Sequence, residues 1–154
     1  MNVEMTVDPV RSAQMALVRG RDTKPEIRVR KALHAAGLRY LLQERRLPGV
    51  PDLVFPQRRL ALFVHGCFWH QHPGCAAARI PKSRLDFWRQ KLSGNVERDA
   101  RKRAELEAMG WVTKVIWECE TRSADALAAL AAEIQAVPQV SGKPSWVRKG
   151  VKRR

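Results

Sequence analysis

The stretch PGVPDLVFPQRRLALFVHGCFWHQHPGC, residues 48–75, carries the pattern from which the fold can be worked out. It predicts a short strand at 52–55, a Pro-Gln turn, and a second strand at 60–64. The second strand is apolar throughout, which indicates a central position in a sheet. A loop at 65–75 begins where this strand ends and holds three of the chain's four histidines and two of its three cysteines.

Helices and further strands are predicted on either side of this stretch. Thr23 and Glu26 form a capping box that begins a helix, and Gly37 ends it. The remaining elements are a strand at 38–42, helices at 83–92 and 95–109, a strand at 111–117 and a helix at 123–137. This order predicts an α/β fold with a mixed central sheet flanked by helices.

The spacing of the cysteines and of one histidine indicates a structural zinc site. Cys67, His72 and Cys75 lie within nine residues, and Cys119 follows the strand at 111–117. A structural zinc takes four such ligands, and it would give rigidity to a loop that has few apolar contacts. The alternative is three small buried thiols, since free cysteine is often buried. An odd cysteine number without an export signal predicts reduced thiols in either case.

Two histidines and one acid remain for chemistry. His65 and His70 are able to act as general bases or to orient a phosphate, although a lone histidine is more often structural. Asp52 begins the short strand that pairs with the strand leading into His65, so it should lie near Val64 and His65. A carboxylate there is a candidate Mg²⁺ ligand, and the alternative is an aspartate that caps a turn.

Large aromatic side chains accompany these ligands. Phe68 and Trp69 lie between the zinc-ligand positions, and Trp88 follows in a predicted helix. Aromatic residues usually pack in cores. In a basic protein, however, exposed aromatic side chains suggest stacking on bases or wedging between them.

The charge of the chain indicates a polyanionic partner. Its 154 residues carry a formal charge of +14 and a pI near 10.8, which favours nucleic acid over a merely solubilising surface. There is no apolar run long enough to span a membrane and no N-terminal secretory signal, so we expect a cytoplasmic protein. We divide the chain into an arm at 1–21, a domain at 22–137 and a flexible basic tail at 138–154.

Four segments resemble the very-short-patch repair (Vsr) mismatch endonucleases and follow the family's order: PGVPDLVFP, FVHGCFWHQHPGC, PKSRLDFWRQKLSGNVERD and GWVTKVIWECE. The resemblance covers about residues 10–120. It implies a restriction-endonuclease-like three-layer fold and a monomeric bacterial endonuclease that acts at the nucleoid. The family nicks one DNA strand on the 5′ side of the T in T·G mispairs, which arise when 5-methylcytosine deaminates. Mismatch-repair proteins and a cytosine-5 methyltransferase are the functional partners it implies.

The resemblance also implies a role for individual residues. The active-site residues it implies are Asp52, His70, His65, Asp99 and Glu26. Magnesium would be held by Asp52 and the backbone carbonyl of Val64, where the family often has threonine. The structural zinc ligands it implies are Cys67, His72, Cys75 and Cys119. The residues it implies to insert into DNA are Phe68, Trp69, Trp88 and, in the arm at 1–21, Met15.

Two departures and two rivals qualify this interpretation. The segment from His72 to Cys75 is one residue longer than in some relatives, and the basic tail has no family counterpart. One rival is a sequence-specific nickase that ignores mismatches, and the other is a zinc-stabilised DNA-binding module without catalysis. A zinc nucleobase deaminase fits poorly, because the H-x-E and P-C-x-x-C elements of those enzymes are absent.

Overall fold

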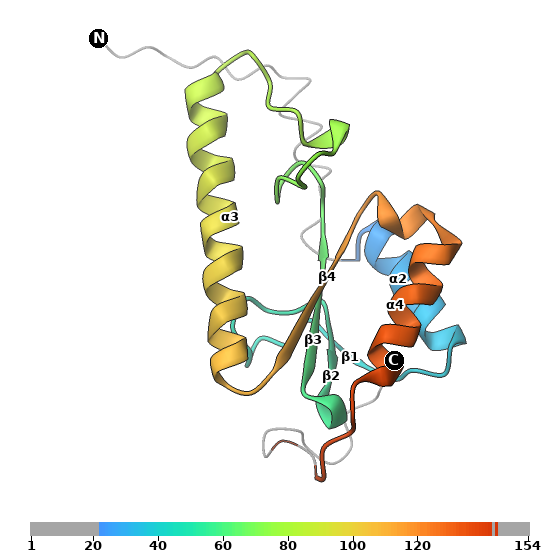
Figure 1. Cartoon of the computed structure of the whole chain (residues 1–154). Helices are drawn as coiled ribbons and strands as arrows, with labels where there is room; N and C mark the ends of the chain where they lie inside the picture. Colours follow the sequence, from blue (N-terminus) through green and yellow to red (C-terminus); the bar gives the residue numbers. More distant parts are fainter. Residues whose placement is uncertain (1–21, 143, 145–154) are drawn as a thin grey trace.

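The computed structural model of the chain describes residues 22–142 and 144. Within them, three α-helices cover the two faces of a four-stranded mixed sheet, which confirms the predicted α/β architecture (Figure 1). The helix α3 lies on one face, and α2 and α4 lie together on the other. The helices are α2 at Lys24–Ala35, α3 at Leu85–Ala108 and α4 at Ala124–Ala136.

The sheet has the order β1-β2-β3-β4. Its strands are β1 at Leu41–Leu42, β2 at Leu53–Phe55, β3 at Leu60–His65 and β4 at Val112–Trp117. The first three strands are antiparallel, whereas β4 runs parallel to β3 along all six residues. The strand β3 is central and almost fully buried, as its continuous apolar sequence predicts for a strand covered on both faces.

The helix α2 begins and ends where the sequence predicts. The hydroxyl of Thr23 accepts the backbone N–H of Glu26 at 3.4 Å, and Gly37 ends the helix with a φ of +88°. The N–H of Leu38 then donates to the carbonyl of Leu33, so Leu38 completes the helix end instead of starting a strand. For this reason β1 is shorter than the predicted strand at 38–42.

The two helices predicted at 83–92 and 95–109 are one continuous helix, α3. The break was expected at Ser93–Gly94, but a glycine inside a helix costs only about 1 kcal/mol. The side chain of Asn95 donates to the carbonyl of Trp69 at 3.1 Å, which ties this part of the helix to the ligand-rich loop. Gly110 stops the helix as predicted, with a φ of +86°.

Two hydrophobic clusters hold the layers together. Val29 and Leu33 of α2 pack with Leu130 and Ile134 of α4 on one face of the sheet. On the other face, Leu106 of α3 packs against buried residues of the strands. Helices therefore fix both faces of the sheet, and the end of β3 is held in a defined position.

The segment after α4 lies at the end of the sheet where β3 begins. Arg58, in the 3₁₀ turn η1 (Pro56–Arg58), donates to the carbonyls of Gln135 and Val137. The N–H of Val140 donates to the carbonyl of Gln57. Residues 138–142 are thus hydrogen-bonded to the domain, and the proposed division of the chain at 137 stays a prediction.

Among the described residues, none of the helices combines the length and the apolar character that a membrane span requires.

Candidate active site and metal centre

The candidate site lies at the carboxyl end of β3, where four elements bring polar side chains together. A cavity of about 640 Å³ is lined there by Asp52 before β2, Val64 of β3, His70 of the following loop and Glu26 of α2. Asp99 of α3 reaches His70 from the side. His65 stacks on His70. All five active-site residues implied by the resemblance therefore lie in or beside this cavity.

Asp52 is held at the edge of the sheet by β3. Its Oδ2 accepts the N–H of Val64 at 2.7 Å, and its Oδ1 accepts from Gln43 at 3.4 Å. Burial, helped by the negative charge of Glu26, raises the pKa of Asp52 to about 7, while the Val64 N–H opposes the shift. The surroundings of this carboxylate therefore disfavour its negative charge.

The carbonyl of Val64 lies on the same side of β3 as Asp52. The polar groups of successive residues in a strand point to alternate sides. The carbonyl of His65 accepts the N–H of Glu118 at 2.8 Å, beyond the end of β4. The N–H and carbonyl of Val64 therefore face the other way, towards Asp52.

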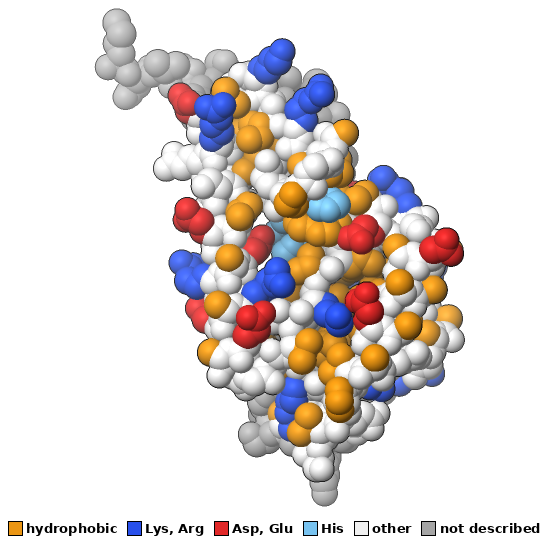
Figure 2. All heavy atoms as spheres, viewed as in Figure 1, with side chains coloured by type: hydrophobic (Ala, Val, Ile, Leu, Met, Phe, Trp, Pro, Cys, Tyr) orange, Lys and Arg blue, Asp and Glu red, His pale blue; other side chains and the backbone are white. Residues whose placement is uncertain are grey.

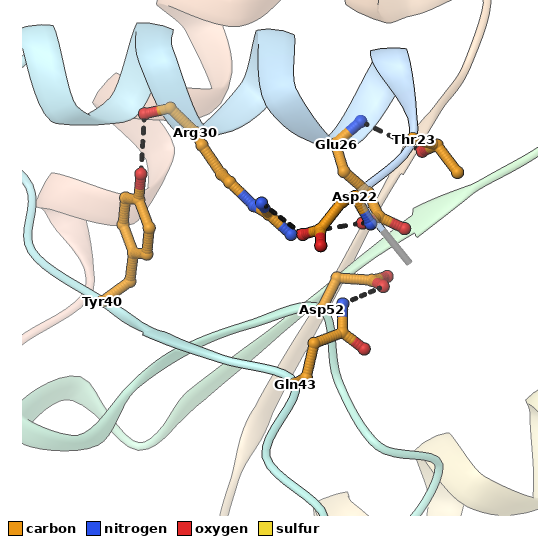
Figure 3. Close-up of polar contacts among 7 residues, drawn as sticks. All are labelled: Asp22, Thr23, Glu26, Arg30, Tyr40, Gln43 and Asp52. Carbon is orange, nitrogen blue, oxygen red and sulfur yellow. Dashed lines mark hydrogen bonds and ion pairs between the residues drawn. The ribbon is translucent and has the colours of Figure 1, made fainter. Parts of the chain in front are cut away.

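Glu26 and Asp52 lie close to each other between α2 and the sheet (Figure 3). The carboxylate of Glu26 is buried, accepts the N–H of Asp22 at 2.7 Å and pairs with Arg30 at 3.3 Å. Arg30 also pairs with Asp22 at 2.7 Å. The reciprocal bond of the capping box thus goes to Asp22, one residue before the expected Thr23.

His65 and His70 form a parallel stack with ring centroids 3.9 Å apart. The Nδ1 of His70 lies 2.6 Å from a carboxylate oxygen of Asp99. Since a carboxylate only accepts, Nδ1 carries the proton and Nε2 is the free position of the His70 ring. Burial lowers the pKa of His65 to about 4, helped by His70, so His65 is neutral at pH 7.

The four predicted zinc ligands converge on one point behind the histidine stack. The ligand atoms of Cys67, His72, Cys75 and Cys119 all lie within 4.8 Å of one another. The Nδ1 of His72 is 3.7 Å from the sulfur of Cys67 and 3.4 Å from that of Cys119. Positive φ angles at Gln71 and Gly74 turn the loop so that His72 and Cys75 reach the cluster.

Both groups of residues fit the metals that the sequence suggests. Ligand atoms around a tetrahedral zinc lie roughly 3.5–3.8 Å apart, given bond lengths near 2.0–2.3 Å. Burial raises the pKa of the Cys67 thiol to about 11, and a bound cation would reverse that shift by favouring the thiolate. At the other site, the buried carboxylates of Asp52 and Glu26 and the carbonyl of Val64 are hard oxygen ligands of the kind Mg²⁺ prefers.

The large aromatic side chains form one cluster between the loop and the start of α3. Phe68 contacts Trp69 and Trp88 with ring centroids 5.1 and 5.4 Å apart. Phe68 and Trp69 are half-buried, whereas Trp88 is buried beneath them. Phe87, which sequence reasoning did not single out, is exposed beside them.

Sequence reasoning also missed two residues that line the cavity, Gln43 and Glu118. Gln43 lies nine residues before Asp52, and no pattern links them. The sequence feature that could have pointed to Glu118 was its position next to Cys119. Met15 falls outside the described residues.

Figure 2 shows histidine side chains reaching the surface among hydrophobic ones, with charged side chains on both sides.

The chain is similar in sequence to known DNA endonucleases. Residues 5–76 match the family model of the DNA mismatch endonuclease Vsr. The chain is 53% identical over 115 residues to a type II nicking enzyme, V.XorIIP, of Xanthomonas oryzae pv. oryzae, covering 75% of this chain and 84% of that one. It is 40% identical over 117 residues to the DNA mismatch endonuclease Vsr of Escherichia coli strain K12, covering 76% and 74%.

Proposed function

The chain belongs to the Vsr family of DNA mismatch endonucleases, and we propose that it nicks one strand of duplex DNA on the 5′ side of the T in a T·G mispair. Mispairs of this kind arise when 5-methylcytosine deaminates. The reaction is a Mg²⁺-dependent hydrolysis of one phosphodiester bond. The restriction-endonuclease-like fold of the family goes with this proposal, and the three layers of the described domain are compatible with it.

The observation that carries the proposal is the cavity shared by Asp52 and His70. The carboxylate of Asp52, a candidate metal ligand, and the ring of His70, with its free nitrogen, face one space. Hydrolysis of a phosphodiester needs both, because the phosphate charge must be neutralised while a water loses its proton. A binding module would have no need of a histidine fixed by a carboxylate, as His70 is by Asp99.

Asp52 and the carbonyl of Val64 would hold the magnesium ion. When bound there, Mg²⁺ would neutralise phosphate charge and stabilise the leaving 3′-oxygen. Glu26 lies close enough to act on the pKa of Asp52, and it adds negative charge that favours a cation over an empty site. Arg30 balances part of that charge through its pair with Glu26.

His70 is the general base in this proposal, and His65 supports it. Asp99 keeps the proton on Nδ1 of His70, so Nε2 can take the proton from water. His65 remains neutral when His70 becomes charged, because burial holds its pKa near 4. The neutral ring of His65 therefore packs against His70 and fixes its orientation without competing for the proton.

The cluster of Cys67, His72, Cys75 and Cys119 would hold a structural zinc ion, which leaves no open coordination position for catalysis. A rigid loop would fix the position of His70 at the cavity and the positions of Phe68 and Trp69 in the aromatic cluster. These half-buried aromatic side chains would insert beside the mispair, where unstacking is cheaper than at a sound pair. Trp88 lies beneath them, and Met15 would contact DNA from the N-terminal arm.

Two duplexes, each tested for nicking in two reactions, test the proposal against its rivals. Matched and T·G duplexes of one sequence are incubated with and without Mg²⁺. We expect a nick 5′ of the T only in the T·G duplex with Mg²⁺, and none with the Asp52→Ala variant. Equal nicking of both duplexes would favour a mismatch-independent nickase, and binding without any nick would favour a non-catalytic module.

The setting implied is the cytoplasm of a bacterium, with the protein acting as a monomer at the nucleoid. Mismatch-repair proteins and a cytosine-5 methyltransferase would be its functional partners. The high positive charge is compatible with a DNA substrate.

A further inference from the structure

A second cavity of about 590 Å³ lies beside the candidate active site, between residues 45–50 and α3. His65 and Asp99 belong to its wall, so it lies behind the histidine stack when seen from Asp52. Gly49, Val50 and Phe63 line both cavities. The two cavities are therefore neighbours that share a wall.

The second cavity is strongly basic. Five of the residues lining it are cations: Arg45, Arg46, Arg98, Lys102 and Arg103. Its two acids are engaged, Asp99 with His70 at 2.6 Å and Glu105 with Lys102 at 3.4 Å. Arg46 is paired with Glu44 at 2.8 Å, so the excess positive charge of the cavity comes from Arg45, Arg98 and Arg103. Among the described residues, Arg45 has no side-chain hydrogen bond or ion pair of its own in the structure.

The cavity is built by close packing and does not result from a chance meeting of surface side chains. A Cβ placed on Gly49 would lie 3.0 Å from the Cβ of Lys102 and 3.2 Å from the ring of Phe63, and its φ is +76°. Leu47 is buried against the same side of the sheet. The segment that carries Arg45 is therefore fixed at contact distance from α3.

We propose that this basic cavity binds the backbone phosphate adjacent to the scissile phosphate on the nicked strand. The proposal rests on the function proposed above, in which the scissile phosphate lies between Asp52 and His70. The strand must continue from there, and the cavity that shares a wall with the active site is the next place it reaches. Cationic walls suit a phosphate, and the aromatic side chains in them, Phe63 and His65, are too buried to stack on a base.

The second phosphate site would position the strand for the reaction. Arginine and lysine side chains on opposite walls would hold one phosphate by charge-assisted hydrogen bonds. Holding that phosphate fixes the next one relative to Asp52 and His70. Arg45 and Lys102 are positioning residues in this view, since they touch the strand and not the reacting atoms.

The test removes two positive charges from the cavity of the protein and, separately, the negative charge of one phosphate in the DNA. Binding of a T·G duplex is measured without Mg²⁺, so that no nicking is needed for the readout. Single phosphates around the nicking position are replaced, one at a time, by neutral methylphosphonates. For the wild-type protein we expect one replacement, next to the scissile phosphate, to weaken binding roughly tenfold, which equals about 1.4 kcal/mol.

In the Arg45→Gln/Lys102→Gln variant the same replacement should cost less than twofold, because its partners are gone. The slope of log K against log salt should also fall by about one. The matched control is Lys31→Gln/Arg122→Gln, which also removes one lysine and one arginine, at exposed positions that line neither cavity. The control should keep the full tenfold cost. Melting temperatures show that each variant is folded.

Equal methylphosphonate costs in the wild type and the cavity variant would overturn the proposal. Inorganic phosphate distinguishes the two sources of the same ligand chemistry. If it binds the wild type but not the variant while the methylphosphonate cost is unchanged, the cavity takes a free anion and the proposal also fails. Nicking of the T·G duplex, measured separately, shows whether the proposed function stands, whichever way the binding result falls.

Discussion

Asp52 illustrates how a functional side chain can reduce stability. Its pKa rises from about 3.9 in an unfolded chain to about 7 in the folded protein, chiefly because it is buried. Between these values the folded state binds a proton that the unfolded state releases. The contribution of Asp52 to the free energy of unfolding should therefore be highest below pH 4 and should fall as pH rises through 7.

Replacing Asp52 by asparagine should remove this dependence. The amide side chain of the Asp52→Asn variant can still accept the N–H of Val64 but carries no charge. In buffer without Mg²⁺ we expect the variant to melt several degrees above wild type at pH 8, with little difference at pH 4, and not to nick DNA. Thermal melts across pH 4–8 check this, and a variant less stable than wild type at pH 8 would contradict the burial argument.

Asp99 is expected to act on His70 through the ring tautomer. In the Asp99→Asn variant the amide can donate to Nδ1, which would move the ring proton to Nε2 and block the base. Since general bases contribute about 10²–10⁴-fold, we expect single-turnover nicking to slow by roughly 10²-fold or more, with DNA affinity nearly unchanged. A rate close to wild type would show that the ring tautomer of His70 does not depend on the charge of Asp99.

We expect the loop after β3 to depend on its candidate metal ligands for its stability. Of its residues 66–75 only Cys67 is buried, and the remaining packing consists of ring contacts made by Phe68, Trp69, His70 and His72. Binding energy of a structural zinc would therefore contribute directly to folding. Replacing Cys75 or His72 by alanine should lower zinc content and melting temperature together.

The histidine at position 34 provides the control for that experiment, since it is exposed on α2 and far from the cluster in sequence. The variant His34→Ala should retain about one zinc per chain and a nearly unchanged melting temperature. Metal analysis that finds no zinc in wild-type protein purified without chelator would refute the zinc assignment.

Substitutions in the aromatic cluster should separate a loss of stability from a loss of nicking at T·G mispairs. Trp88 is buried, so Trp88→Ala should lower the free energy of unfolding by about 3–5 kcal/mol. Trp69 is half-buried, and Trp69→Ala should instead cost roughly tenfold or more in nicking of T·G duplexes, because base–aromatic stacking is worth about 1–3 kcal/mol. Binding to matched and T·G duplexes is measured beside stability. An equal loss on both duplexes would mean that Trp69 only packs the loop.

The helices and the loop after β3 show which structural features the sequence predicts and which it does not. Capping residues such as Thr23 and Gly37 act locally, so the limits of α2 were predictable. The ligand spacing from Cys67 to Cys75 was equally local, and the cluster was found. The helix α3 continues across Gly94, where Asn95 donates to the carbonyl of Trp69, a tertiary contact that the local sequence does not encode.

The same reason explains which features of the site the sequence did not predict. The position of Asp52 beside Val64 followed from one hairpin and was predicted. Burial of Trp88, the stack of His65 on His70 and the presence of Glu118 in the cavity all require segments that are distant in sequence to meet. A single sequence offers no signal for such meetings unless a known pattern supplies it.

At the scale of the whole molecule, the candidate site and the C-terminal segment lie at opposite ends of β3. The site gathers around His65, where the strand ends, while Val140 and Gly142 hydrogen-bond to Gln57 and Arg59, just before it begins. Residues 143–154, which carry six of the chain's 29 lysines and arginines, therefore follow an anchor at the end of β3 opposite the candidate site.

Removing residues 143–154 should weaken DNA binding without changing its selectivity. Phosphate contacts carry no sequence information, and each one lost should lower the slope of log K against log salt by about 0.9. The cut belongs after Gly142, because a cut at 137 would also remove the bonds to Gln57 and Arg59. Affinities for matched and T·G duplexes between about 50 and 200 mM salt measure both effects. If the truncated protein loses its preference for T·G at every salt concentration, the C-terminal residues take part in reading the mispair, and the opposite-end arrangement does not separate affinity from recognition.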